Sequence, residues 1–85
     1  MTFQLRQDVS LADTEYGTVL LDERSGRYWQ LNPSGVLVVN TLLAGDDTEQ
    51  AVTALTEEYQ VDAAKARADV RTLVDGLRSA GLVSS

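Results

Sequence analysis

The dipeptide Asn32-Pro33 separates two parts of the chain that differ in periodicity. Asn is a preferred N-cap residue, and Pro is tolerated at the first helical position because its missing N–H would have no partner there. The residues before this point are β-branched and aromatic, whereas the apolar residues after it recur at helical spacing. Strands therefore come first and helices follow, an order that predicts an α+β fold.

Three strands are predicted, at residues 9–13, 17–22 and 27–31. A four-residue connection that ends in Gly26 joins the last two strands. This connection predicts a hairpin built on a type I turn, with Gly26 at positive φ.

The strand at 27–31 is rich in aromatic residues and lies between arginines. Period-2 alternation places Tyr28 and Gln30 on one face of the sheet and Arg27, Trp29 and Leu31 on the other. One set should contribute to the core and the other to a groove or to the solvent face, and the sequence does not decide which.

Three helices are predicted, at residues 33–43, 48–59 and 62–80. The first is apolar almost all round and should be the central buried helix. Asp47, with Gln50 three residues later, indicates a capping box for the second helix. Asp62 is the predicted N-cap of the third, and Gly81 follows its end.

The third helix carries two adjacent stripes at 100° per residue. The stripe predicted to face the core consists of Ala66, Val70, Leu73 and Leu77. The stripe beside it consists of Arg67, Arg71, Val74 and Arg78. These arginines could simply cover the rim of the core with their heads in water. Alternatively, they could form the cationic wall of a shallow groove between strand and helix, suited to an acidic, amphipathic peptide.

The chain has 85 residues and contains neither His nor Cys. Its length predicts one domain, residues 1–85. The usual general base, metal ligand and thiol nucleophile are missing, and many carboxylates fall at helix N-termini, where capping explains them. We therefore predict a protein that is not an enzyme and that uses no cofactor or metal.

The net charge is −6, which disfavours nucleic-acid binding because basic residues supply much of the affinity for phosphate. No apolar run approaches about 20 residues, and the N-terminus lacks the apolar core of a signal peptide, so no membrane segment is expected. The lack of Cys fits a reducing compartment, and we expect a cytoplasmic protein.

Three segments in order resemble the PqqD-like family, also called RiPP recognition elements. They are a strand pair ending in Leu31-Asn32 that opens a buried helix, "AGDDT" before the second helix, and "VRTLVDGLRSAGLV" at the end. The resemblance covers nearly the whole chain. Within the family, the chain is most similar to the small stand-alone B1 proteins of lasso-peptide biosynthesis. The resemblance implies a winged helix-turn-helix-like fold, with a three-stranded antiparallel sheet followed by three helices.

The resemblance also implies a function. The protein would bind the leader segment of a ribosomally made precursor peptide, which adds as a strand to the third strand and contacts the third helix. It would then present that precursor to a separate leader peptidase of the B2 type and, through it, to the cyclase. The implied peptide-binding residues are Arg27, Tyr28, Trp29, Gln30, Leu31, Arg67, Val70, Arg71, Val74, Leu77 and Arg78.

Three alternatives stay open at this level. The first, within the family, is a peptide chaperone that serves a radical SAM enzyme. The second is a winged-helix DNA-binding regulator that uses the third helix for recognition. However, that helix with its cap has a net charge of only +1, from four basic and three acidic residues. The third is a small regulatory or structural subunit without a peptide ligand.

Overall fold

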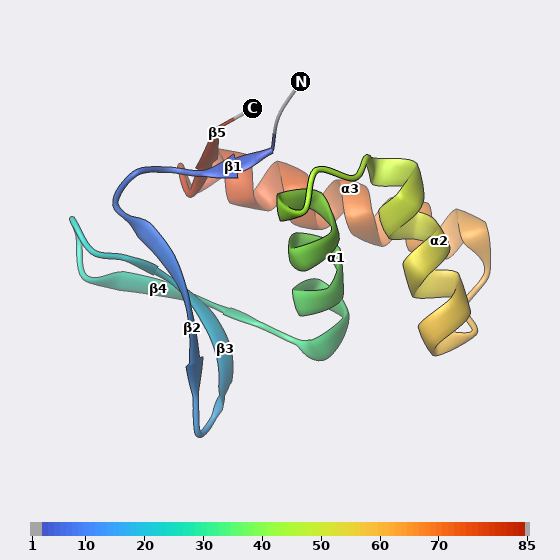
Figure 1. Ribbon diagram of the computed structural model, residues 1–85, viewed down its shortest axis with the longest axis horizontal. Helices are drawn as coiled ribbons and strands as arrows, with labels where there is room; N and C mark the ends of the chain where they lie inside the picture. The colour runs from blue at the N-terminus through green and yellow to red at the C-terminus, as the bar shows by residue number, and fades with distance from the viewer. Residues whose placement is uncertain (1–2, 85) are drawn as a thin grey trace.

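Three antiparallel strands precede three helices in the computed structural model, which describes residues 3–84 (Figure 1). The strands of the sheet are β2 (Val9–Thr14), β3 (Gly17–Asp22) and β4 (Arg27–Leu31). The helices are α1 (Pro33–Leu43), α2 (Thr48–Tyr59) and α3 (Ala63–Ser79). The predicted α+β order is confirmed. The predicted domain, 1–85, includes residues 1, 2 and 85, which lie outside the described residues.

The two hairpins follow from local hydrogen bonds. Between β2 and β3, the Thr14 hydroxyl donates to the Gly17 carbonyl at 2.8 Å across a two-residue connection. Between β3 and β4, the Gly26 N–H donates to the Asp22 carbonyl at 2.8 Å, and Gly26 has φ of 75°. The predicted positive φ at Gly26 is thus confirmed.

The predicted helix N-caps are confirmed. The Asn32 side chain accepts from the Gly35 N–H at 2.8 Å at the start of α1. Asp47 and Gln50 form the reciprocal capping box of α2. Helix α3 begins one residue later and ends one residue earlier than predicted, because Asp62 and Ala80 are its cap residues.

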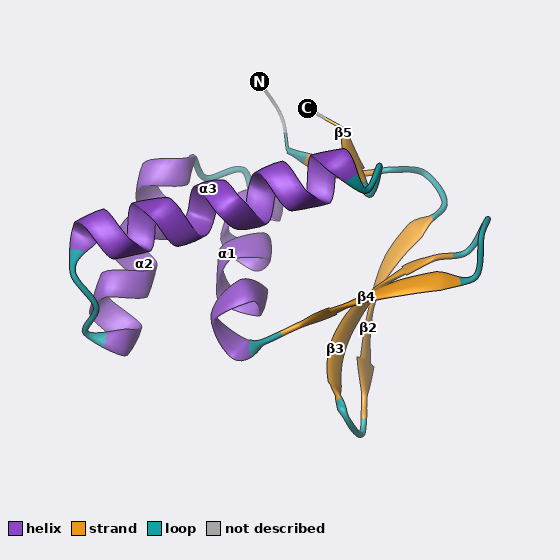
Figure 2. Cartoon of the chain, turned by 180° about the vertical axis from the view of Figure 1, so that it is seen from behind, coloured by secondary structure: helices purple, strands orange, loops and turns teal. Residues whose placement is uncertain are grey.

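The core has two parts, and α1 contributes to both, as expected for a central helix. One part lies between the three helices and includes Val38 and Leu42 of α1. The other lies between the helices and the sheet and includes Val39 of α1. Helix α3 runs across α1 and α2 and extends toward the sheet, so it borders both parts (Figure 2).

Two short strands were not predicted. β1 (Gln4–Leu5) pairs with β5 (Val83–Ser84) and brings the two ends of the described chain side by side (Figure 1). Arg6 extends this pairing, because its N–H donates to the Leu82 carbonyl at 3.0 Å and its guanidinium donates to the Gly81 carbonyl at 2.8 Å. A two-residue strand is too short to show periodicity, and its partner lies at the other end of the chain.

Candidate functional site

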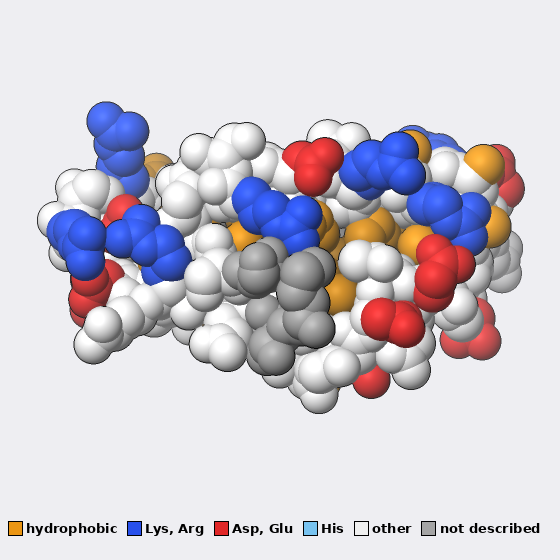
Figure 3. Space-filling model, turned by 90° about the horizontal axis from the view of Figure 1, so that it is seen from above, with side chains coloured by type: hydrophobic (Ala, Val, Ile, Leu, Met, Phe, Trp, Pro, Cys, Tyr) orange, Lys and Arg blue, Asp and Glu red, His pale blue; other side chains and the backbone are white. Residues whose placement is uncertain are grey.

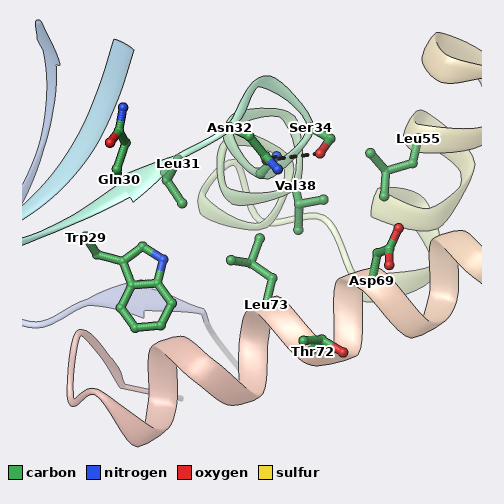
Figure 4. Close-up of a pocket in the computed structure, with 11 residues that line it drawn as sticks. Trp29, Gln30, Leu31, Asn32, Ser34, Val38, Leu55, Asp69, Thr72 and Leu73 are labelled. Carbon is green, nitrogen blue, oxygen red and sulfur yellow. Dashed lines mark hydrogen bonds between the residues drawn. The ribbon is translucent and has the colours of Figure 1, made fainter. Parts of the chain in front are cut away.

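A hollow of about 370 Å³ lies between β4, the first turn of α1 and α3 (Figure 4). We call it the β4 groove. Its lining comes from all three helices and β4 and comprises Trp29, Gln30, Leu31, Asn32, Ser34, Gly35, Val38, Leu55, Asp69, Thr72 and Leu73. The buried side chains of Leu31, Val38 and Leu55 make its floor apolar.

The structure decides which face of β4 is turned inward. Leu31 is buried and Trp29 half-buried, and both pack in the core between the sheet and the helices. Tyr28, at 69% exposure, and Gln30 are exposed on the opposite face. Figure 4 shows the Trp29 ring and Leu31 directed toward α3, with Gln30 directed away. The remaining residue of the strand, Arg27, is exposed.

Gly76 allows Trp29 to lie close to α3. A Cβ atom at position 76 would lie 3.3 Å from the indole Cη2 atom, which is tighter than ordinary contact. A glycine inside a helix lowers helix stability by about 1 kcal/mol relative to Ala, so its presence here needs a packing reason. The approach of the indole to the helix backbone is that reason, and it sets the spacing between β4 and α3.

The outer edge of β4 has backbone groups without a ladder partner in the described part of the chain, because the sheet order is β2-β3-β4. The Glu23 N–H donates at 2.8 Å to a carbonyl of the segment that precedes β2, so Glu23 faces β2. Backbone groups alternate in direction along an antiparallel strand, so Asp22 faces its partner Arg27 in β4. By the same alternation, the N–H and C=O groups of Tyr28 and Gln30 point outward.

The charge of the β4 groove differs from the sequence-based expectation. Among its described lining residues, Asp69 has the one formal charge, and it forms an ion pair with Lys65 at 3.5 Å. The walls are therefore not cationic. Beyond Asp69 the groove continues into a second hollow of about 290 Å³, which includes Tyr59 and Val61.

The arginine stripe lies elsewhere. Arg67, Arg71 and Arg78 line a separate hollow of about 450 Å³ between α2 and α3. We call this hollow the arginine face. Figure 3 shows basic side chains beside apolar ones on this side of the molecule. Asp69, in the β4 groove, and Arg71 are two residues apart and therefore about 200° apart around the helix. The expectation that strand 27–31 and the arginine stripe face each other across one groove is thus wrong.

The position of α3 also corrects the predicted core stripe. Val74, placed with the arginines from the sequence, is buried at 5% exposure, whereas Leu73 is half-buried and lines the β4 groove. Val70 and Leu77 are buried in the core as predicted. The helix is turned this way because its Gly76 side packs on Trp29, and helical periodicity alone does not identify the side that meets a strand.

Several residues of the β4 groove were not predicted as site residues. They are Asn32, Ser34, Gly35, Val38, Leu55, Asp69, Thr72 and Leu73. The interior glycine of α3, opposite an aromatic strand, was the one sequence signal that could have indicated the correct side of the helix.

Arg67 is held in place on the arginine face by a two-point ion pair with Glu49. The guanidinium Nε and Nη2 atoms donate to the two carboxylate oxygens at 3.2 and 2.9 Å. The hydrogen bonds and the charge of Arg67 lower the pKa of Glu49, and those of Glu49 raise the pKa of Arg67. The pair joins the first turn of α2 to α3.

The described part of the chain contains neither a cluster of metal-ligating side chains nor a helix that could span a membrane. Within residues 3–84, no three His, Cys, Asp or Glu side chains are grouped so that they could hold a metal ion. No helix in this part of the chain is both long enough and apolar enough to cross a membrane.

Two solved structures share the fold over the full length of this chain. One is described as a lasso peptide synthetase B1 complexed with the leader peptide; it is 42% identical, with a TM-score of 0.94, and the match covers 100% of both chains. The other is described as TbiB1 in complex with the TbiA(beta) leader peptide; it is 27% identical, with a TM-score of 0.84, and 96% of its chain is covered. None of the curated proteins matches the sequence. Residues 17–83 match the family described as coenzyme PQQ synthesis protein D (PqqD), and the chain therefore belongs to the PqqD family.

Proposed function

We propose that this protein binds the leader segment of a ribosomally synthesised precursor peptide, which adds to β4 as a further strand and places side chains in the β4 groove. The observation that carries this proposal is the open edge of β4 directly beside a groove with an apolar floor. The two similar structures are both described as leader-peptide complexes, which supports this class of ligand. The protein acts by binding and not by catalysis.

The backbone contacts of such a strand follow from the alternation in β4. The incoming peptide would pair with the outward N–H and C=O groups of Tyr28 and Gln30, as in other cases of strand addition to a sheet edge. These contacts are independent of the leader's side chains, so they supply affinity but do not select the sequence that binds. They also remove the exposed edge, which is otherwise a site for unwanted pairing.

Side-chain contacts would supply specificity. Every second residue of an added strand points to the inner side, where Trp29, Leu31 and Leu73 lie. Because this surface is apolar, we expect apolar leader side chains at those positions. Asp69 disfavours a leader carboxylate beside it, so the acidic, amphipathic peptide suggested by the sequence is replaced by a leader that is apolar in the groove.

We further propose that the bound leader is presented to a separate leader peptidase and, through it, to the cyclase of lasso-peptide biosynthesis. The full-length likeness to a lasso peptide synthetase B1, at 42% identity, supports this pathway over service to a radical SAM enzyme.

A titration tests the proposal. The probe is the fluorescein-labelled leader of the cognate precursor peptide, with a scrambled leader and a labelled DNA duplex as controls. We expect saturable binding of the leader that persists at high salt, because the groove contacts are apolar and backbone-mediated. Binding of the duplex without binding of the leader would contradict the proposal.

A further inference from the structure

The arginine face remains unused when a leader occupies the β4 groove. The two hollows share α3 but lie on opposite sides of it, and no residue lines both. A leader strand on β4 would therefore leave the arginine face exposed in the complex. A second partner could reach this face without displacing the leader.

The three arginines of the arginine face differ in whether a carboxylate of the protein lies beside them. Arg67 is paired with Glu49 through two hydrogen bonds, and Arg78 lies 3.9 Å from the Asp75 carboxylate. Arg71 is exposed between them, and no ion pair joins it to a carboxylate within residues 3–84. Arg67, one turn earlier, has the same charge, and the Asp75 carboxylate, one turn later, is the one that lies 3.9 Å from Arg78. An incoming carboxylate would therefore find a guanidinium without an ion-pair partner, whose N–H groups can donate two parallel hydrogen bonds to the carboxylate oxygens.

The dimensions suit a segment of polypeptide. From Arg67 to Arg78 the row extends about 16 Å along the helix, at 1.5 Å per residue. An extended chain of about five residues covers that length. Val52, Val70 and Val74 form the apolar floor of the hollow, so the segment can contact both charged and apolar groups.

A nucleic acid fits this face poorly. Two of the three arginines are close to carboxylates of the same face, and the protein has a net charge of −6. Affinity for a duplex depends on neutralising several phosphates at once, and one unneutralised arginine does not supply this. The charge pattern instead matches one or two carboxylates displayed on a protein.

We propose that the arginine face docks an acidic segment of the partner protein that processes the bound leader, with a carboxylate of that segment paired to Arg71. The inference rests on the proposed function, because the partner is the leader peptidase to which the precursor would be presented. The precursor would then be held on one side of α3 and the peptidase on the other.

The test measures two affinities for each variant. Leader binding is measured by fluorescence anisotropy, and binding of the purified cognate leader peptidase is measured by interferometry, with and without leader. The variants are Arg71→Gln, Arg71→Lys and Arg71→Glu. Arg24→Gln is the matched control, because it removes the same charge from an exposed position in the β3–β4 turn. Circular dichroism confirms that each variant is folded.

We expect Arg71→Gln to weaken peptidase binding roughly tenfold, since a charge-assisted hydrogen bond is lost, and Arg71→Glu to weaken it further. Arg71→Lys should restore part of the affinity, because lysine keeps the charge but not the two-point geometry. Leader affinity should be unchanged in all variants, and Arg24→Gln should resemble the wild type in both assays.

Three results would overturn the inference: wild-type peptidase binding by Arg71→Glu, loss of leader binding in that variant, or binding of a DNA duplex that depends on Arg71. Failure of the wild type to bind the leader would instead refute the proposed function. Peptidase binding by the leader-free protein would still decide the role of the arginine face.

Discussion

Replacing Gln30 with proline tests strand addition directly, because the outward direction of this residue's N–H is set by the register of the sheet. The Gln30 N–H points away from β3, so Gln30→Pro should leave the β3–β4 ladder intact. Proline is tolerated on an edge strand when its missing N–H faces outward, and its effect on the preceding residue favours the extended backbone already present.

The expected loss of leader affinity has two causes. The hydrogen bond donated by the Gln30 N–H is lost, and the leader carbonyl that would accept it is left without a donor. A backbone hydrogen bond contributes about 0.5–1.5 kcal/mol net, and a leader carbonyl left without a partner costs about 1–3 kcal/mol more. Together these effects should lower leader affinity by about 2–4 kcal/mol, or roughly 30- to 1,000-fold in Kd.

The matched control is Gln30→Ala. It removes the side-chain hydrogen bond to the Tyr16 carbonyl, which is 3.1 Å long, but keeps the backbone N–H. Both variants should melt close to the wild type, and fluorescence anisotropy with labelled leader should separate them. If folded Gln30→Pro binds the leader as tightly as Gln30→Ala does, strand addition at this edge is refuted.

Three further predictions concern packing, turn geometry and pH. Gly76→Val should displace Trp29, lowering stability by about 1–3 kcal/mol in urea unfolding and weakening leader binding in the anisotropy assay; unchanged values for both would contradict the role given to this glycine. Gly26→Ala should cost about 1–2 kcal/mol in thermal unfolding, through positive φ alone, because an added Cβ would meet no atom within 4 Å; an unchanged melting temperature would refute this. Arg67 lowers the pKa of Glu49 below its ordinary 4.5 in the folded state, so the stabilisation from this carboxylate is present above pH 4.5 and is lost as pH falls through the lowered pKa. Glu49→Gln should therefore be less stable than the wild type at neutral pH, and this difference should shrink in acid; an equal difference at both pH values, measured by urea unfolding, would contradict the assignment.

Features determined within a few residues could be predicted from the sequence. The N-cap at Asn32, the capping box of Asp47 with Gln50 and the positive φ of Gly26 each depend on hydrogen bonds or sterics between near neighbours. These local signals establish the order of strands and helices, and they placed the aromatic strand 27–31 before the buried helix. The strand half of the candidate site was therefore accessible from the sequence.

The tertiary structure alone decided which surfaces meet. The sequence left open which face of β4 is buried, and it placed the arginine stripe rather than Asp69 and Leu73 opposite that strand. Both questions depend on the packing of Trp29 against Gly76, two residues far apart in the chain. The apolar stripe of an amphipathic helix has two borders, and the helical period is the same on both. Periodicity therefore does not show which border faces a given strand. Contact with a specific partner decides between the two borders, and this contact exists only in the folded molecule.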